Sequence, residues 1–173
     1  MIFSVYATIS YAFTNQIVAR IDGHLFTEYD IKVHFTVLQA LMKEKISSRD
    51  FIDTYTYSKD HLDSSINAYL TYQDAVKLRR VKKITHGTLR NYVQGFHKKF
   101  ASSEIKDAFY KKLDVNEREM EEVLSVLYTT QNYFFEIYHI DIFGALDDDS
   151  RKKITEIYTS MRKKYSITYP TEN

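Results

Sequence analysis

Residues that form tight turns are scarce in this chain, and their scarcity constrains the fold more than any other feature. Average usage predicts about 12 glycines and 9 prolines in a chain of this length, whereas the 173 residues include 4 glycines and 1 proline. β-Sandwiches and small barrels need a turn signal between every pair of short strands. Long helices are therefore expected. The apolar fraction of 44% and the charged fraction of 27% are typical of a folded domain rather than a disordered one.

A hairpin is predicted near the start of the chain. The β-branched run 17–21 is followed by Asp22-Gly23 and by a second short apolar run at 24–26. Asp-Gly between two such runs favours a tight hairpin turn, because that turn needs positive φ at both central residues. Thr27 then predicts a helix start, since its hydroxyl can cap the first amide groups of the segment that follows.

Helical periodicity dominates the rest of the sequence. Apolar residues recur at steps of three and four, and Ile31, Phe35, Leu38 and Met42 are expected on one buried stripe. Helices are predicted at 28–42, 58–80, 89–100, 105–113, 120–138 and 147–165, with a short one between 47 and 55 and an extended piece at 140–143. Residues 167–169 predict a closing strand that Pro170 stops. The expected fold is mostly α, with a small β-sheet formed by the N-terminal hairpin and the C-terminal strand.

The first 13 residues are apolar and stand apart from this pattern. Ser10-Tyr11-Ala12 is similar to the small-residue site before a signal-peptidase cut. No positive charge precedes Arg20, so 1–13 is interpreted as the remnant of a signal peptide that starts upstream. An N-terminal strand or arm is the alternative. Residues 14–173 are expected to form a single domain.

The stretch 17–31, IVARIDGHLFTEYDI, resembles the opening of the SurA-like periplasmic chaperones. There a strand ending in Asn/Asp-Gly precedes a short strand, a Thr or Ser cap and an acidic first turn. The similarity continues in layout with a helix at 62–78, a Lys-Ile-Thr cap at 83–85 and a long helix at 120–138. The segment 150–169 resembles the C-terminal helix and strand of the family.

The resemblance implies a chaperone core without a parvulin prolyl isomerase domain, because only 141–150 separates the long helix from the last one. It also implies that the helix and strand at 147–169 pack back on an N-terminal lobe formed by 14–143. The function it implies is that of an ATP-independent periplasmic holdase. Its clients would be unfolded or exported polypeptides such as outer-membrane proteins, and neither isomerase activity nor a cofactor is expected.

Aromatic residues are unusually frequent, with 15 tyrosines and 11 phenylalanines but no tryptophan. Most are expected in the core, and some are expected to line a groove that binds apolar chains. The candidate lining residues lie on the long helix and the last helix: Phe134, Phe135, Tyr138, Tyr158, Met161 and Tyr165. For each of them, a place in the core is the simpler interpretation.

The sequence contains no recognisable motif for catalysis or metal binding. The six histidines lack metal-ligand spacing on any helix face, and with no cysteine there is no thiolate site. Asp147, Asp148 and Asp149 are better explained by the positive end of a helix than by a calcium loop. Four glycines leave little scope for a phosphate-binding loop. The protein is therefore not expected to be an enzyme.

A basic stretch at 75–103 contains no acidic residue. Its cations are Lys77, Arg79, Arg80, Lys82, Lys83, Arg90, Lys98 and Lys99, with Tyr92, Phe96 and Phe100 interleaved. The favoured interpretation is a solvated face above aromatic residues of the core. The alternatives are a small helical protein that binds nucleic acid or an anionic lipid surface, or an assembly factor for a single client.

Overall fold

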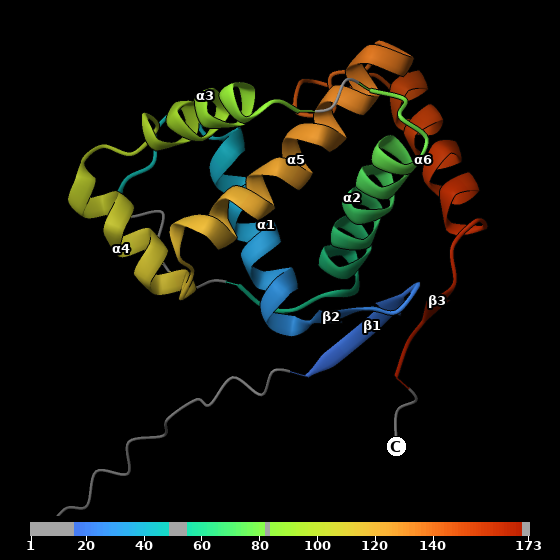
Figure 1. Cartoon of the computed structure of the whole chain (residues 1–173), viewed down its shortest axis with the longest axis horizontal. Coiled ribbons are helices and arrows are strands. Elements are labelled where there is room, and N and C mark those ends of the chain that lie inside the picture. Colours follow the sequence, from blue (N-terminus) through green and yellow to red (C-terminus); the bar gives the residue numbers. More distant parts are fainter. Residues whose placement is uncertain (1–15, 49–54, 82–83, 171–173) are drawn as a thin grey trace, which may run out of the picture.

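The computed structural model describes residues 16–48, 55–81 and 84–170. The candidate signal peptide at 1–13, most of the short helix expected between 47 and 55, and Lys82 and Lys83 lie outside these residues. Within them, helices and strands follow one another in the order β1, β2, α1 to α6 and β3 (Figure 1). The strands are β1 (Ile17–Ile21), β2 (His24–Thr27) and β3 (Ile167–Thr168). The helices are α1 (Glu28–Met42), α2 (Lys59–Lys77), α3 (His86–His97), α4 (Ser103–Leu113), α5 (Glu117–Tyr138) and α6 (Asp148–Arg162).

The three strands form one antiparallel sheet in the order β2-β1-β3. Asp22 and Gly23 both have positive φ, 47° and 88°, as the predicted Asp-Gly turn requires. Arg20 of β1 is the register partner of Thr168, and Ile21 that of Ile167. The sheet therefore joins the N-terminal hairpin to the end of the chain, and the predicted fold class is confirmed.

Polar side chains cap the N-termini of the helices. Thr27 caps α1 in a capping box: its hydroxyl accepts a bond from the backbone N–H of Asp30, and the Asp30 carboxylate accepts one from the backbone N–H of Thr27. Asn116 forms the same arrangement with Glu119 at the start of α5. Such caps satisfy backbone N–H groups that lack a partner within the helix.

Helix α5 runs through the middle of the molecule and divides its interior into two parts (Figure 1). The helical core lies around α3, α4 and the first half of α5. It comprises Val33, Val37, Ala40, Ile46, Val93, Phe96, Phe100, Phe109, Tyr110, Leu113, Met120, Leu124 and Leu127. The sheet-side core lies between the sheet, α2, α6 and the second half of α5. It comprises Val18, Ala19, Ile21, Phe26, Ile31, Leu62, Ile66, Leu70, Ala75, Tyr133, Phe134 and Met161.

Two expectations from the periodicity are wrong in detail. Met42 is 63% exposed: Ile31, at the start of its row, is buried, and Phe35 and Leu38 are half-buried, but the fully buried residues further along α1 are Val33, Val37 and Ala40. The piece 140–143 is not an extended strand: residues 140–141 are irregular and residues 142–143 form a turn. The backbone N–H of Ile140 donates to the carbonyl of Phe134 at 3.2 Å, so these residues close the end of α5 instead of pairing with a strand.

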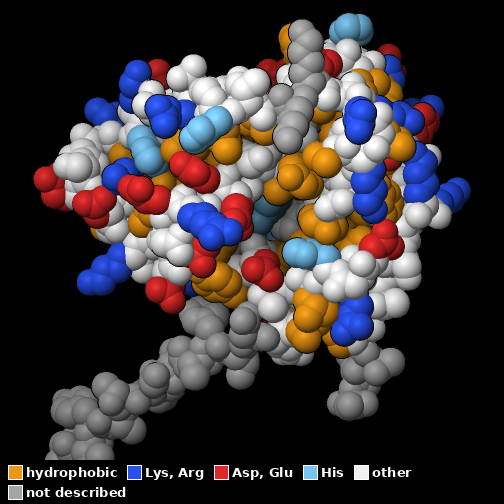
Figure 2. All heavy atoms as spheres, in the orientation of Figure 1, with side chains coloured by type: hydrophobic (Ala, Val, Ile, Leu, Met, Phe, Trp, Pro, Cys, Tyr) orange, Lys and Arg blue, Asp and Glu red, His pale blue; other side chains and the backbone are white. Residues whose placement is uncertain are grey.

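The surface carries charges of both signs among hydrophobic side chains, without a large area of one sign on the face shown in Figure 2. This distribution agrees with the formal net charge of +1. Binding through a global electrostatic field therefore has little basis in this structure.

Candidate functional site

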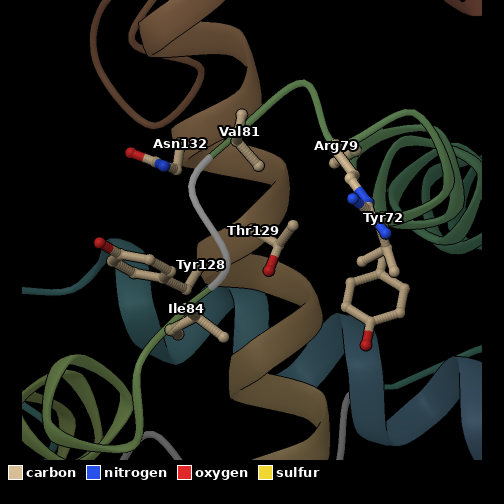
Figure 3. A pocket seen from close by; sticks show the side chains of 9 residues that line it. Tyr72, Arg79, Val81, Ile84, Tyr128, Thr129 and Asn132 are labelled. Carbon is tan, nitrogen blue, oxygen red and sulfur yellow. The ribbon is translucent and has the colours of Figure 1, made fainter.

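The largely apolar cavity between α2 and α5 is the strongest candidate for a binding site. Its volume is about 490 Å³, within the range of known ligand pockets. Figure 3 shows Tyr72 and Arg79 on one side and Tyr128 and Ile84 on the other, with Thr129 of α5 between them. Ala75, Val76, Val81 and Asn132 complete the lining.

Two helical rows build the walls of this cavity. On α2, Tyr72 and Val76 are four residues apart, which places them on one face of the helix. On α5, Tyr128 and Asn132 are likewise four residues apart. The two rows line the same cavity from two helices and form the walls of a groove.

The end of α2 supplies the rest of the wall. Arg79 has a left-handed backbone with φ of 48°, and the backbone N–H of Arg80 donates to the carbonyl of Ala75 at 3.2 Å. This bond closes the last turn of the helix and reverses the chain. Val81 and Ile84, which lie between α2 and α3 in the chain, also line the cavity.

Tyr128 is supported by an aromatic residue of α3. The ring of Tyr92 on α3 packs edge-on against it, with 4.9 Å between the ring centroids. Burial raises the pKa of Tyr92 to about 12, and nearby Tyr128 contributes to the rise. The Tyr92 phenol that supports Tyr128 is therefore neutral at physiological pH.

One residue of the cavity lining is a largely exposed apolar side chain: Val76 is 54% exposed. Two further exposed apolar residues lie close to the lining along the helices. Leu78, two residues after Val76, is 50% exposed, and Phe135, one helical turn beyond Asn132 on α5, is 60% exposed. Single exposed apolar residues are common on protein surfaces, whereas a continuous exposed apolar patch is typical of a binding site. Phe135 is one of the six predicted lining residues, but it is not part of the lining of this cavity.

The structure places the six predicted lining residues in different surroundings. Phe134 and Met161 are 0% and 2% exposed and lie in the sheet-side core. Tyr138, Tyr158 and Tyr165 are half-buried against that core. Phe135 is the only one of the six that is largely exposed.

Contacts of the half-buried tyrosines are mainly with neighbouring side chains of the fold. The ring of Tyr158 packs edge-on against Phe134, with 5.4 Å between centroids, and burial raises the pKa of Tyr158 to about 12. The ammonium groups of Lys153 and Lys77 lie 5.4 Å and 5.2 Å from the ring centroids of Tyr138 and Tyr165. Such contacts stabilise the packing of α6 on the molecule.

A second, more polar cavity of about 300 Å³ brings Tyr138 and Met161 together. Arg80, Lys153 and Lys164 line it as well. Its three cations make it less suited to apolar chains than the cavity between α2 and α5.

The basic stretch is partly engaged within the fold. Lys77 pairs with Asp22 at 3.6 Å and Arg80 with Asp74 at 3.9 Å, and the ammonium of Lys99 donates to the carbonyls of Leu41 and Lys43. The aromatic residues of the basic stretch were expected in the core. Phe96 and Phe100 are buried, and Tyr92 is half-buried.

Helical periodicity puts Tyr72 and Val76 on the apolar face of their helix, where a place in the core is expected, and it marks no role for Tyr128. The cavity forms only where α2, α5 and the segment after α2 meet, so the periodicity of any one helix does not reveal it. The sequence holds one weak indication that Val76 is exposed: it lies at the end of the expected helix and directly precedes the group of cations that begins at Lys77.

Within the described ranges, no cluster of three or more histidine and acidic side chains is arranged to hold a metal ion. The helices of the described part of the chain also lack the length and apolar character needed to cross a membrane.

Comparisons with protein-family models, with curated proteins and with solved structures find no match to this chain. The resemblance to SurA-like chaperones therefore rests on the hairpin and cap residues and on the order of the elements.

Proposed function

We propose that this protein is an ATP-independent holdase that binds extended apolar and aromatic segments of unfolded polypeptides. The observation that carries the proposal is the largely apolar cavity of about 490 Å³ between α2 and α5, whose lining residue Val76 is exposed. The exposed Phe135, one helical turn beyond Asn132 on α5, adds apolar surface along the same helix. The hairpin and cap residues that resemble SurA-like chaperones give it further support. They also support the periplasm as its location and exported outer-membrane proteins as its clients, without isomerase activity.

The walls of the groove suit an adaptable client. Burial of apolar client surface contributes about 25 cal/mol per Å², and Tyr72 and Tyr128 offer large contact area at a small loss of side-chain freedom. Arg79 and Asn132 at the same cavity provide hydrogen-bond donors for the backbone carbonyls of an extended segment. The groove can thus hold many sequences weakly, as a holdase requires.

The test is suppression of aggregation when an unfolded outer-membrane β-barrel protein is diluted from urea without ATP, at low and at high salt. We expect protection at both salt concentrations, because apolar burial dominates. The double variant Val76→Ser, Phe135→Ser should lose most of this protection. Met42→Ser is the matched control, because Met42 is equally exposed but lies on α1.

Three outcomes would contradict the proposal. Protection by the wild type could be absent at every stoichiometry. The double variant could protect as well as the wild type. The control could lose as much activity as the double variant, in which case the groove would have no special role.

Loss of binding between about 50 and 200 mM salt would instead point to phosphate contacts. The quadruple variant of Arg79, Arg80, Lys82 and Lys83 would then abolish binding to nucleic acid or to anionic lipid. Protection of one client alone would point to a dedicated assembly factor.

A further inference from the structure

A third cavity, of about 410 Å³, lies between the hairpin, α1, α2 and the first half of α5. Figure 2 shows a hollow near the centre of the displayed face, where histidine, acidic and hydrophobic side chains meet. The cavity is lined by His24, Phe26, Tyr29, Asp30, Val33, His34, Ser65, Tyr69, Val115, Glu119, Glu122, Val123 and Val126. None of these described lining residues is a lysine or an arginine.

Aromatic rings form one wall of this cavity. The rings of His24 and Tyr69 are stacked, with 4.6 Å between their centroids and 13° between their planes. Phe26 meets both rings edge-on, at 4.9 Å and 5.1 Å. Faces of aromatic rings attract organic cations, and clusters of such rings are the usual recognition device for ammonium groups.

Three exposed carboxylates form a rim of this cavity. Asp30 and Glu119 are fixed there by the capping boxes of α1 and α5. Glu122 lies one helical turn further along α5. The guanidinium of Arg118 lies 3.2 Å from the Glu122 carboxylate in an exposed pair. Exposed pairs of this kind are weak, so the rim keeps an excess of negative charge.

One residue of the lining is a neutral histidine. The Nδ1 atom of His34 lies 3.0 Å from the hydroxyl of Ser65, which lines the cavity as well. Burial lowers the pKa of His34 to about 4, so the ring is neutral near pH 7 and does not repel a cation.

We infer that this cavity binds a small organic cation, an ammonium group attached to an apolar or aromatic body. The body contacts Phe26 and Tyr69, and the charge lies near the carboxylate rim. The inference does not depend on the holdase proposal, because it concerns a different cavity and a different ligand.

Three probes of similar shape and different charge test the inference on the full chain. Phenethylammonium carries the positive charge, 2-phenylethanol is neutral and 3-phenylpropionate is negative. Titrations followed by calorimetry and by protein NMR should show saturable binding of the cation, about tenfold tighter than binding of the alcohol. The anion should bind most weakly. Equal affinities for all three, or no saturable binding of the cation, would overturn the inference.

Variants then locate the binding site. Tyr69→Leu keeps apolar volume but removes the ring face, and it should weaken binding of the cation about three- to fivefold. Glu122→Lys should weaken it at least threefold at low salt, about as much as loss of a close charge pair allows. Glu121→Lys is the matched control, because it changes the net charge equally at an exposed residue outside the lining. Equal effects of the two lysine variants would contradict the assigned site.

Discussion

The helical core and the sheet-side core are of similar size but are held together differently. In the helical core, the rings of Phe96, Phe100 and Phe109 pack against one another with centroids 5.2 to 6.2 Å apart. The sheet-side core is crossed by buried hydrogen bonds between helices. Tyr133 donates to the carboxylate of Asp74 at 2.9 Å, and Thr130 donates to the carbonyl of Ala68 at 3.1 Å.

This contrast shows two sources of stability within one chain. Packed rings contribute through apolar burial and dispersion, which depend on volume and shape. Buried hydrogen bonds contribute little net free energy when they are made, but leaving one partner unsatisfied is costly. The helical core should therefore be most sensitive to lost volume, and the sheet-side core to lost polar partners as well.

The largest expected effect is that of removing a buried ring. Phe96→Ala and Phe134→Ala should each lower the free energy of unfolding by about 3–5 kcal/mol, because these side chains are 1% and 0% exposed. Phe135→Ala should change it by no more than about 0.5 kcal/mol. Urea unfolding of the three variants measures this. A small loss for Phe134→Ala would contradict the place of Phe134 in the sheet-side core.

The next effect concerns His34, between α1 and α2. The unfolded chain takes up a proton at this histidine near pH 6.5, and the folded chain only near pH 4. The stability contribution of the neutral buried ring is therefore complete above pH 6.5 and is lost as the pH falls towards 4. The loss is about 3 kcal/mol at most.

Urea unfolding at several pH values between 7 and 4 tests this prediction. The double variant His34→Leu, Ser65→Ala should show a flatter fall in stability than the wild type over that interval. Parallel curves for the two proteins would mean that another group is responsible for the acid sensitivity.

A smaller effect distinguishes the polar contacts of the two cores. Tyr133→Phe leaves the buried carboxylate of Asp74 without its phenol donor and should reduce stability by about 1–3 kcal/mol. Tyr110→Phe in the helical core removes the 2.7 Å contact with Nε2 of His97. His97 is only half-buried, so water replaces the hydroxyl and the loss should be about 1 kcal/mol or less.

Urea unfolding of the two phenylalanine variants under the same conditions gives this comparison. Equal losses, or a larger loss for Tyr110→Phe, would remove the proposed difference between the cores.

Much of the fold follows from local sequence patterns. Asp22-Gly23 predicts the hairpin because few other residue pairs adopt positive φ twice in succession, and Thr27 predicts the start of α1 because its hydroxyl can accept a bond from Asp30. The candidate cavities do not follow from such patterns. Tyr72 and Tyr128 line the same cavity only because α2 packs on α5.

The burial of residues 134 and 135 could not be predicted from the sequence around them. Both are phenylalanines on the same helix, and sequence alone offered the same two roles for each. The structure turns Phe134 into the sheet-side core and leaves Phe135 exposed, because the neighbours of α5 cover only part of its circumference.

The sequence by itself determined the helical class, the hairpin, the caps and the strand that closes the sheet, because each depends on the conformational preferences of a few neighbouring residues. Only the tertiary structure decided which aromatic side chains are buried and where the cavities lie. Those properties arise between elements far apart in the chain, and they depend on how the helices pack rather than on the preferences of any single segment.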